Sequence, residues 1–371
     1  MATPVAAFEA LSDQNHALST VDLVTTPNPL VAVDLFGTNR AKITGWERYA
    51  LNLYQALVDA HPSDLTLWPL KRGAAGSSRF DHLRRALTHY FFSTRHDLAG
   101  THPRVFHATT FPPGFVPRHT KVVWTVHDDL ILGGHREFAR RGAVIWNRLA
   151  QARLARVDAF VTSTQTVRRE LVALGVPEEK IHLVSAPSNP LPAATNAPSV
   201  THVDGSPAML PSQFVLVVGT LEPRKRVDLA SRIAARAGLP ILLVGHRSNV
   251  DLSTLAPGTL LASGVSDGEL AWCYENASAL LSASAYEGIN MPLFEAAERG
   301  LQVVASNIDV HRELAGEYID RVALVDPINE DLAASVLAER VAVGRVAPRE
   351  ILATYATLAE QHLAIYRSLL D

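Results

Sequence analysis

The stretch QFVLVVGTLEPRKRVDLASRIAARAGLPILLVG (213–245) decides the fold class of this protein. It begins with the apolar run QFVLVVG at 213–219 and ends with a second one, LPILLVG at 239–245. Between the two runs, apolar residues recur at helical spacing over 226–238. Continuous apolar runs are typical of strands buried on both faces, and a helix between two such strands predicts a parallel βαβ unit. The fold class is therefore α/β.

The alternation of strand and helix continues through two blocks of the chain. One block spans 30–187 and the other 213–347, and each is predicted to form a parallel sheet covered by helices. Residues 188–212 are rich in proline and small polar residues and predict a linker, so we expect a cleft between the blocks. Residues 1–29 lack a steady period and predict a flexible extension, whereas 348–371 are predicted to be helical.

Composition excludes several classes of protein. The 371 residues include 34 Lys and Arg against 37 Asp and Glu, which lacks the basic excess that nucleic-acid binding needs. The single cysteine, Cys273, excludes an internal disulfide and a cysteine-based zinc site. No apolar run approaches the roughly 18 residues of a membrane span, and the N-terminus does not resemble a signal peptide. A cytoplasmic protein is therefore expected.

The chain also lacks the common motifs for phosphate and metal binding. It contains no G-x-G, no G-x-x-x-x-G-K-[ST], no D-x-D and no two histidines three or four residues apart. These absences exclude a dinucleotide fingerprint, a P-loop, a helical pair of histidine ligands and an aspartate pair that holds a metal against a diphosphate. A ligand of this protein is expected to bind without these devices.

Two adjacent cations, Arg224 and Lys225, follow the strand at 213–219 and precede the helix at 226–238. Ligands of open α/β sheets bind at the carboxyl ends of strands, and a helix N-terminus offers N–H groups and a positive dipole. The pair suits a diphosphate, because arginine supplies a planar fork of donors and lysine a point charge. A solvated basic turn that caps the helix would explain the same spacing.

Two glutamates follow a later strand, in SASAYEGINMPLFEAAERG (282–300). Glu287 is predicted to lie in a loop, and Glu295 in the first turn of a helix that begins with proline. Carboxylates accept hydrogen bonds from sugar or ribose hydroxyls, and Gly288 allows a ligand to approach the backbone closely. Stabilisation of the helix dipole is the alternative role for Glu295.

These motifs resemble those of the GT-B glycosyltransferases of family 4. Members show, in this order, G-x-x-E-P-R-K, G-x-V-S-D-x-E-L, S-x-x-E-G-F-G-L-P-x-x-E-A and P-V-V-A-S with a later glutamate. The chain reads GTLEPRK (219–225), GVSDGEL (264–270), SAYEGINMPLFEA (284–296) and QVVASNIDVHREL (302–314). The first block is similar to the family in ITGWERY (43–49), TVHDDL (125–130) and STQTVRREL (163–171). The resemblance thus extends over residues 30–371 except the linker.

The resemblance implies a GT-B fold, in which two Rossmann-like parallel-sheet domains face an inter-domain cleft and the C-terminal helix packs back toward the first domain. It implies a retaining glycosyltransferase that moves a hexose from a nucleotide-sugar, such as GDP-mannose, to a glycan or lipid-linked acceptor. The closest-looking members build bacterial surface polysaccharides. No metal and no other cofactor is implied, in agreement with the missing D-x-D.

Two alternatives to this function remain open. The first is a nucleotide-sugar epimerase or hydrolase, for which Asp128, Asp129 and Glu287 are the candidate acid–base groups. The second is a non-catalytic nucleotide-sugar-binding protein, which the departure from the family motif at Asn290 suggests.

The resemblance implies catalytic roles for four residues. Arg224 and Lys225 would neutralise the donor diphosphate and stabilise the leaving nucleoside diphosphate in place of a metal. Glu287 would face the donor sugar. His127 would lie across the cleft, near the transferred sugar, and bond a hydroxyl or the transition state. A histidine at a strand end is also common as an ordinary polar group with a satisfied hydrogen bond.

Further residues are implied in donor binding. Glu295 would hold the ribose hydroxyls, the backbone around Val265 would meet the base, and Gly45 would let its loop close over the phosphates. The remaining donor-binding positions that the motifs imply are Gly219, Gly288, Asn290, Met291 and Leu293.

The chain departs from the family pattern at two positions. Asn290 replaces a glycine, so its side chain is expected to enter the donor pocket while its backbone tolerates left-handed geometry. Trp46 follows Gly45 where a small aliphatic residue is common, and it is expected to alter the closing loop.

A basic stretch, residues 135–156, contains six arginines but only one acidic residue, Glu137, and Arg118 lies upstream of it. Its apolar residues permit an amphipathic helix, and a basic helix can rest on an anionic membrane. We therefore hypothesise membrane-surface contact that gives access to a lipid-linked acceptor. A solvated helix face is the alternative.

Overall fold

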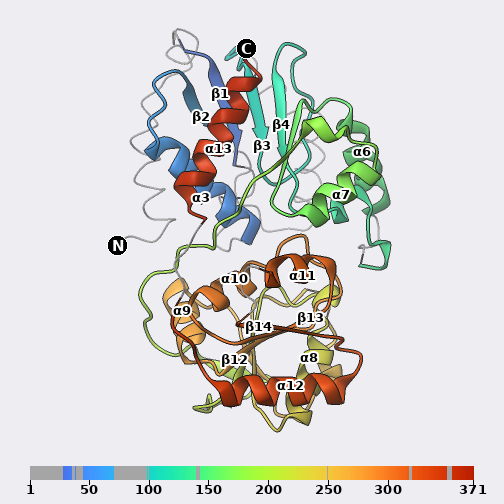
Figure 1. The fold of residues 1–371 in the computed structure, drawn as a ribbon, viewed down its shortest axis with the longest axis vertical. Coiled ribbons are helices and arrows are strands. Elements are labelled where there is room, and N and C mark those ends of the chain that lie inside the picture. Colours follow the sequence, from blue (N-terminus) through green and yellow to red (C-terminus); the bar gives the residue numbers. More distant parts are fainter. Residues whose placement is uncertain are drawn as a thin grey trace. The chain divides into compact units, whose positions relative to one another are not determined.

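The computed structural model describes residues 28–35, 38, 45–70, 98, 100–138, 143–248, 250–316, 320–348 and 353–371. The chain divides into two compact units, one formed by Met1–Pro187 with Ala353–Asp371 and the other by Ser188–Leu352. Each unit contains its own sheet (Figure 1). The extension expected at 1–29 lies outside the described residues, apart from its last two positions.

The first unit contains a six-stranded sheet in which all neighbours are parallel, in the order β2-β1-β3-β4-β5-β6. Its strands are β1 (Leu30–Asp34), β2 (Thr66–Leu70), β3 (Val105–Ala108), β4 (Lys121–Thr125), β5 (Ala159–Thr162) and β6 (Ile181–Leu183). All five residues of β1 are buried, as a continuous apolar run predicts for a strand covered on both faces.

Helices cover both faces of this sheet. They are α3 (Gly45–Asp59), α6 (Ala143–Leu154), α7 (Gln165–Ala173) and α13 (Tyr355–Ser368), with the 3-10 turns η2 (Leu130–Leu132), η3 (Arg136–Phe138) and η4 (Glu178–Lys180). Val31 and Val33 of β1 share a core with α3 and α13, whereas Ala32 shares a core with α6 and α7. Since α13 packs against α3, the C-terminal helix belongs to the first unit, as the resemblance implied (Figure 1).

The second unit contains an eight-stranded sheet in the order β14-β13-β12-β9-β10-β11-β7-β8. Its strands are β7 (Val200–His202), β8 (Pro207–Ala208), β9 (Val215–Val218), β10 (Ile241–Val244), β11 (Leu260–Ala262), β12 (Ala279–Ser282), β13 (Val303–Ser306) and β14 (Val322–Val325). Its helices are α8 (Val227–Arg236), α9 (Asp267–Asn276), α10 (Met291–Glu298), α11 (Asp309–Ala315) and α12 (Glu330–Val343), with the 3-10 turns η5 (Pro223–Lys225) and η6 (Leu252–Thr254).

The segment 188–212 differs from the linker that its composition predicts. It contains β7 and β8, which form an antiparallel hairpin that extends the sheet at β11. The hairpin turns at Gly205, whose φ of 87° suits a glycine, and its strands are only three and two residues long. Such short strands leave no apolar run in the sequence, so the prolines dominate the pattern.

The order of the second sheet reverses at one pair of strands. From β9 the chain goes to β10 and β11 on one side, and then returns to β12 on the other side. Strands β9 and β12 are parallel neighbours, so their carboxyl ends lie side by side at the point where the strand order reverses. Ligands of open α/β sheets bind at such a switch point.

Candidate functional site

The loop after β9 places Arg224 and Lys225 on η5, directly before α8. Arg226 then adopts a left-handed conformation, with φ of 45°, from which α8 begins. The carbonyl oxygen of Arg224 accepts a hydrogen bond from the Ala285 backbone N–H at 2.7 Å, and Arg224 Nη1 donates to the Tyr286 carbonyl at 3.1 Å. The loops that follow β9 and β12 are therefore joined to each other.

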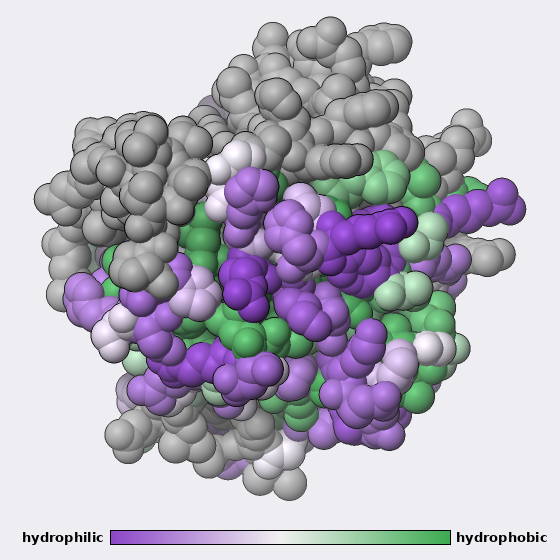
Figure 2. Space-filling model, turned by 90° about the horizontal axis from the view of Figure 1, so that it is seen from above, coloured by the Kyte–Doolittle hydropathy of each residue, from purple (hydrophilic) through white to green (hydrophobic). Residues whose placement is uncertain are grey.

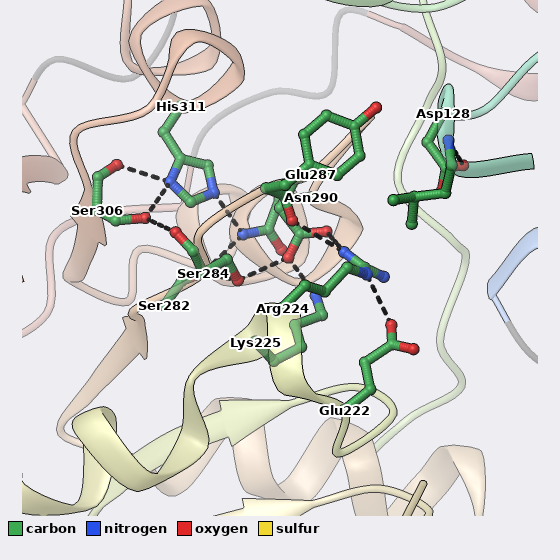
Figure 3. Close-up of polar contacts among 12 residues, drawn as sticks. Asp128, Glu222, Arg224, Lys225, Ser282, Ser284, Glu287, Asn290, Ser306 and His311 are labelled. Atoms are coloured by element: carbon green, nitrogen blue, oxygen red, sulfur yellow. Dashed lines mark hydrogen bonds and ion pairs between the residues drawn. The ribbon is translucent and has the colours of Figure 1, made fainter. Parts of the chain in front are cut away.

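Both cations point to one carboxylate, that of Glu287 (Figure 3). Lys225 Nζ lies 2.5 Å from Glu287 Oε1, and Arg224 Nη1 pairs with the other carboxylate oxygen. On its outer side, Arg224 Nε lies 2.7 Å from Glu222 Oε1. The side chain of Glu287 is 2% exposed, whereas those of Arg224 and Lys225 are 14% and 11% exposed. The basic pair thus lies at the surface of the cluster and Glu287 lies beneath it.

Electrostatics keep Glu287 ionised. Burial would raise the pKa of this carboxyl, but Arg224, Lys225 and hydrogen bonds from Lys225 and Ser284 together lower it to about 2. Burial lowers the pKa of the Lys225 ammonium, while its attraction to Glu287 opposes that change. At neutral pH Glu287 is therefore an acceptor of hydrogen bonds and not a proton donor.

The backbone and the side chain of Asn290 are both fixed within the cluster. Its φ of −106° is not left-handed, and its side chain is 2% exposed. Nδ2 lies 2.9 Å from both Ser282 Oγ and His311 Nε2. Asn290 nevertheless lines a small cavity together with Lys225, Ser282 and Ser284. Its side chain therefore forms part of the wall of the pocket and is not free within it.

Glu295 lies deeper in the protein than its predicted role suggests. Since α10 begins at Met291, Glu295 is in the second turn and not the first, so the helix dipole affects it little. The side chain is buried and accepts hydrogen bonds from Tyr274 Oη at 2.6 Å and Asn189 Nδ2 at 3.2 Å. A ribose hydroxyl would join or replace these partners.

The other predicted donor-binding residues of the second unit differ in how far they are exposed to solvent. Gly219 directly follows β9 with φ of 128°, and a Cβ there would lie 3.5 Å from Lys225 Cε. Val265 is partly buried and directly precedes Ser266, the N-cap of α9. Gly288 is buried in the loop after β12. Leu293 is fully buried in the hydrophobic core, so its side chain cannot contact a ligand.

In the first unit, His127 follows β4 and lies among aromatic side chains. Its ring stacks on Trp46, with centroids 5.5 Å apart, and meets the edge of Tyr49 at 4.9 Å. Nε2 donates to the Thr109 carbonyl at 3.0 Å, so Nδ1 is the acceptor. Burial lowers the pKa of His127 to about 4, and the imidazole is neutral at neutral pH. Gly45 is the first residue of α3, next to Trp46.

Two family models match consecutive parts of the chain. The model described as Glycosyltransferase Family 4 matches residues 43–187, and the one described as Glycosyl transferases group 1 matches residues 206–339. Together they account for most of both units. The chain is a GT-B glycosyltransferase of the family 4 type.

Solved structures agree on the fold of this glycosyltransferase. Sucrose-phosphate synthase from Thermosynechococcus elongatus has a TM-score of 0.60 at 14% identity, over 92% of this chain and 99% of that one. HepE from Anabaena, solved in complex with UDP-glucose, has a TM-score of 0.54 at 12% identity, over 92% and 98%. At these identities the likeness shows the GT-B fold alone.

Relatives of known function match only a part of the glycosyltransferase. The serotype-specific mannosyltransferase WbdA of Escherichia coli is 34% identical over 127 residues, which is 30% of this chain and 15% of that protein. The O-antigen chain mannosyltransferase B of Escherichia coli is 28% identical over 132 residues, 32% and 34%. The chain therefore spans well under half the length of these relatives.

One group of described side chains in the glycosyltransferase has the composition of a metal site. Asp129, His135 and Glu170 of the first unit place ligand atoms within 4.8 Å of one another. His135 Nδ1 also lies 3.4 Å from Glu137 Oε1. In the second unit, Glu287 already shares its carboxylate between two cations, and their charge disfavours a divalent metal there.

Two arginines of the basic stretch at 135–156 have structural partners. Arg153 donates to the Pro113 and Gly114 carbonyls, and Arg156 donates to the Thr120 carbonyl and pairs with Asp158. Both side chains thus hold the loop between β3 and β4. No described helix has the length and apolar character to cross a membrane. The face drawn in Figure 2 mixes hydrophilic with hydrophobic residues.

The contact between His311 and Asn290 was not predicted from the sequence. His311 lies on α11, is fully buried, and forms a hydrogen bond with Asn290. The histidine is visible in QVVASNIDVHREL (302–314), but nothing in the sequence shows that it faces Asn290 across the end of the sheet. The pairing depends on β12 and β13 being neighbours.

Proposed function

We propose that this glycosyltransferase moves a hexose from a nucleotide-sugar to a glycan or lipid-linked acceptor, in the synthesis of a surface polysaccharide. The observation that carries the proposal is the basic pair Arg224 and Lys225 at the switch point of the second sheet, joined to Glu287. A diphosphate suits this place because arginine and lysine form charge-assisted hydrogen bonds to phosphate oxygens, and ligands of open α/β sheets bind at the switch point.

The charges favour a ligand anion. Glu287 and Glu222 balance the two cations in the free protein, but Glu222 lies at the outer side of Arg224 and is partly exposed. A unit charge pair at 4 Å is worth roughly 4 kcal/mol at an effective dielectric near 20. A diphosphate can therefore compete with Glu222 for Arg224, while the buried Glu287 keeps both cations in place.

The proposed chemistry needs no metal. Arg224 and Lys225 stabilise the negative charge that develops on the leaving diphosphate, which is the role a metal has in other transferases. The acceptor hydroxyl attacks the anomeric carbon on the face that the diphosphate leaves, and the leaving phosphate oxygen takes its proton. This step retains the anomeric configuration. His127, neutral and with Nδ1 as acceptor, bonds a sugar hydroxyl.

For the donor we propose a nucleotide-hexose, with GDP-mannose as the first to test. Both curated relatives are named as mannosyltransferases, and one of them is named for the O-antigen chain. HepE was solved with UDP-glucose, which makes a uridine nucleotide the second to test.

A thermal-shift panel of GDP, UDP, ADP and dTDP tests the diphosphate site. A ligand that binds only the folded protein raises the melting temperature in proportion to its affinity. We expect one nucleotide to stabilise the wild type, and Arg224→Ala to lose that shift. Arg236→Ala is the matched control, since Arg236 pairs with Glu330 and Asp331 on exposed surface. Equal shifts in the wild type and Arg224→Ala would contradict the proposal.

Donor consumption with and without a glycan acceptor then tests the reaction. Release of nucleoside diphosphate that depends on the acceptor supports glycosyl transfer. Isomerised or hydrolysed donor identifies an epimerase or hydrolase, and tight binding without turnover identifies a nucleotide-sugar-binding protein. Added EDTA is expected to leave the rate unchanged, and a loss of rate would overturn the metal-independent step.

We also propose that the surface of α6 rests on an anionic membrane. Arg148 is exposed on this helix, and Val144 beside it is 61% exposed. Vesicles of anionic and of neutral lipid test this contact in a sedimentation assay. Binding to anionic vesicles that Arg148→Glu weakens supports it, and no binding by the wild type overturns it.

A further inference from the structure

A chain of hydrogen bonds leads from Glu287 to His311 (Figure 3). Ser284 Oγ donates to Glu287 Oε1 at 2.7 Å, and Ser282 Oγ lies 3.3 Å from Ser284 Oγ. Asn290 Nδ2 lies 2.9 Å from Ser282 Oγ and 2.9 Å from His311 Nε2. One asparagine side chain is therefore fixed from two directions.

The Glu287 end determines the direction of these bonds. An ionised carboxylate only accepts, so the hydroxyl proton of Ser284 must point to Glu287. Ser284 Oγ then accepts from the hydroxyl of Ser282, which has one proton to give. Ser282 Oγ in turn accepts from Asn290. This order places the NH₂ group of the asparagine toward Ser282.

The His311 end gives the same answer independently. Nδ1 of His311 lies 2.8 Å from the Ser306 carbonyl oxygen, which only accepts, so Nδ1 holds the proton. Burial lowers the pKa of His311 to about 4, so the ring is neutral and Nε2 has a lone pair. That lone pair accepts a hydrogen bond from the NH₂ group of Asn290.

Both N–H bonds of the Asn290 amide are thus used within the protein. No donor lies on its carbonyl oxygen, Oδ1, in the part of the chain that the structure describes. Asn290 lines the cavity beside Lys225. Oδ1 is therefore left as an acceptor on a fixed side chain that lines the same cavity as Lys225.

We propose that Asn290 determines donor specificity: its Oδ1 accepts a hydrogen bond from a hydroxyl of the transferred sugar, and His311 is the positioning residue that holds it. The inference rests on the proposed function, which places a sugar next to the basic pair. An amide oxygen repels the phosphate oxygens and attracts an O–H group, so it interacts with the sugar and not with the diphosphate. A site built around such a bond rejects a sugar that lacks the hydroxyl, because the oxygen is then left unpaired.

Binding of paired ligands tests this assignment. The purified full chain is titrated by calorimetry with GDP and GDP-mannose, and with UDP and UDP-glucose. The measured quantity is the dissociation constant of the bare diphosphate divided by that of its sugar conjugate, so that a larger ratio means a larger contribution of the sugar to binding. In Asn290→Gly we expect diphosphate binding to stay within about twofold of wild type. The ratio for the preferred sugar should fall about tenfold, which corresponds to about 1.4 kcal/mol.

Three further variants separate positioning from general damage. His311→Ala removes the acceptor opposite Asn290 and is expected to lower the ratio severalfold. His311→Gln restores an acceptor and is expected to recover most of it. The control is Asn307→Ala, at an exposed asparagine that follows the neighbouring strand β13, and it should behave as wild type. Melting temperatures show which variants are folded, and the His311 pair tests the proposal if Asn290→Gly is not.

Each outcome points to one conclusion. A wild type that binds none of GDP, UDP, ADP and dTDP removes the proposed function and this inference with it. If the diphosphate binds but its sugar adds no affinity, or if Asn290→Gly keeps the full ratio, the inference alone is overturned. If His311→Gln is as weak as His311→Ala, the positioning role of His311 is overturned.

Discussion

The two units place side chains at the carboxyl ends of their parallel strands, but they use opposite chemistry. In the second unit, two cations surround one buried carboxylate. In the first unit, His127 is neutral and lies between the rings of Trp46 and Tyr49. Ion pairs hold the arrangement in the second unit, whereas hydrogen bonds and ring contacts hold the one in the first unit.

This difference shows how the same sheet architecture can serve different ligand groups. An ionic cluster binds an anion strongly and discriminates little among neutral groups. A neutral imidazole beside aromatic rings offers directional acceptors and an apolar surface, which suit a sugar ring with its hydroxyls. The difference also sets the cost of disruption, because an unpaired buried charge is far more expensive than an unpaired neutral group.

The largest effect is expected from removal of Glu287. Glu287→Ala leaves Arg224 and Lys225 close together without the carboxylate between them, at a cost of about 3–5 kcal/mol in the free energy of unfolding. Denaturant unfolding of the two proteins measures it. Glu330→Ala is the control, because Glu330 also joins two arginines but at a more exposed place, and its loss should cost far less. Equal losses would break the contrast between buried and exposed charge.

Turnover is expected to depend more on the ionic cluster than on the neutral one. Lys225→Ala removes the charge that the proposed mechanism uses to stabilise the leaving diphosphate, and we expect the rate at saturating donor to fall about 10²–10³-fold. His127→Ala removes one neutral hydrogen bond and is expected to cost about tenfold. Steady-state rates with one acceptor and both variants decide the order. A larger loss for His127→Ala would reverse the roles assigned to the two units.

Acid should destabilise the first unit before the second. The folded pKa of both His127 and His362 is about 4, against an ordinary value of 6.5, so the unfolded chain binds more protons between these values. The contribution of these two neutral histidines to the free energy of unfolding is fully present above pH 6.5 and is lost as the pH falls toward 4. For Glu287, with a pKa of about 2, the corresponding loss comes only between pH 4.5 and 2. His311 is the one buried histidine of the second unit with such a pKa among the described residues.

Hydrogen exchange measured by mass spectrometry at pH 7 and pH 5 assigns the loss of protection to each unit, after correction for the intrinsic rate. His362→Asn keeps a donor for the Leu358 carbonyl but does not titrate, and it should reduce the acid sensitivity of the first unit. Equal acid sensitivity in the two units would show that the buried histidines do not cause the difference.

The elements that the sequence predicted are those with long apolar runs. The strands β9 and β10 lie within the apolar runs at 213–219 and 239–245, and α8 lies within the predicted helix at 226–238. The strands β7, β8 and β11 were missed because two or three residues are too few to show a period. Strand β14 was missed as well, although its four residues are as many as those of β9.

The cluster of the second unit was predicted only as a list of residues. The sequence indicates that Arg224, Lys225 and Glu287 follow strands, but not that β9 and β12 are neighbours. In the sequence, Asn290 is recognised only as a residue that replaces a glycine of the family motif. The sequence does not show that His311 contacts it, because the two residues lie 21 positions apart. Order along the chain thus predicts the types of residue at a site, whereas the strand order determines which of them meet.

The smallest expected effect concerns two tyrosines on the packed helices of the first unit. Tyr366 Oη on α13 lies 2.7 Å from His107 Nδ1, and both side chains are fully buried. Tyr366→Phe leaves that nitrogen without its partner and should cost about 1–2 kcal/mol in the free energy of unfolding. Tyr49 Oη on α3 is buried and has no hydrogen-bond partner among the described residues, so Tyr49→Phe should be neutral or slightly stabilising. Thermal unfolding of both variants compares the two directly, and a loss of stability in Tyr49→Phe as large as that in Tyr366→Phe would mean that ring packing, and not hydrogen bonding, holds α13 on the first unit.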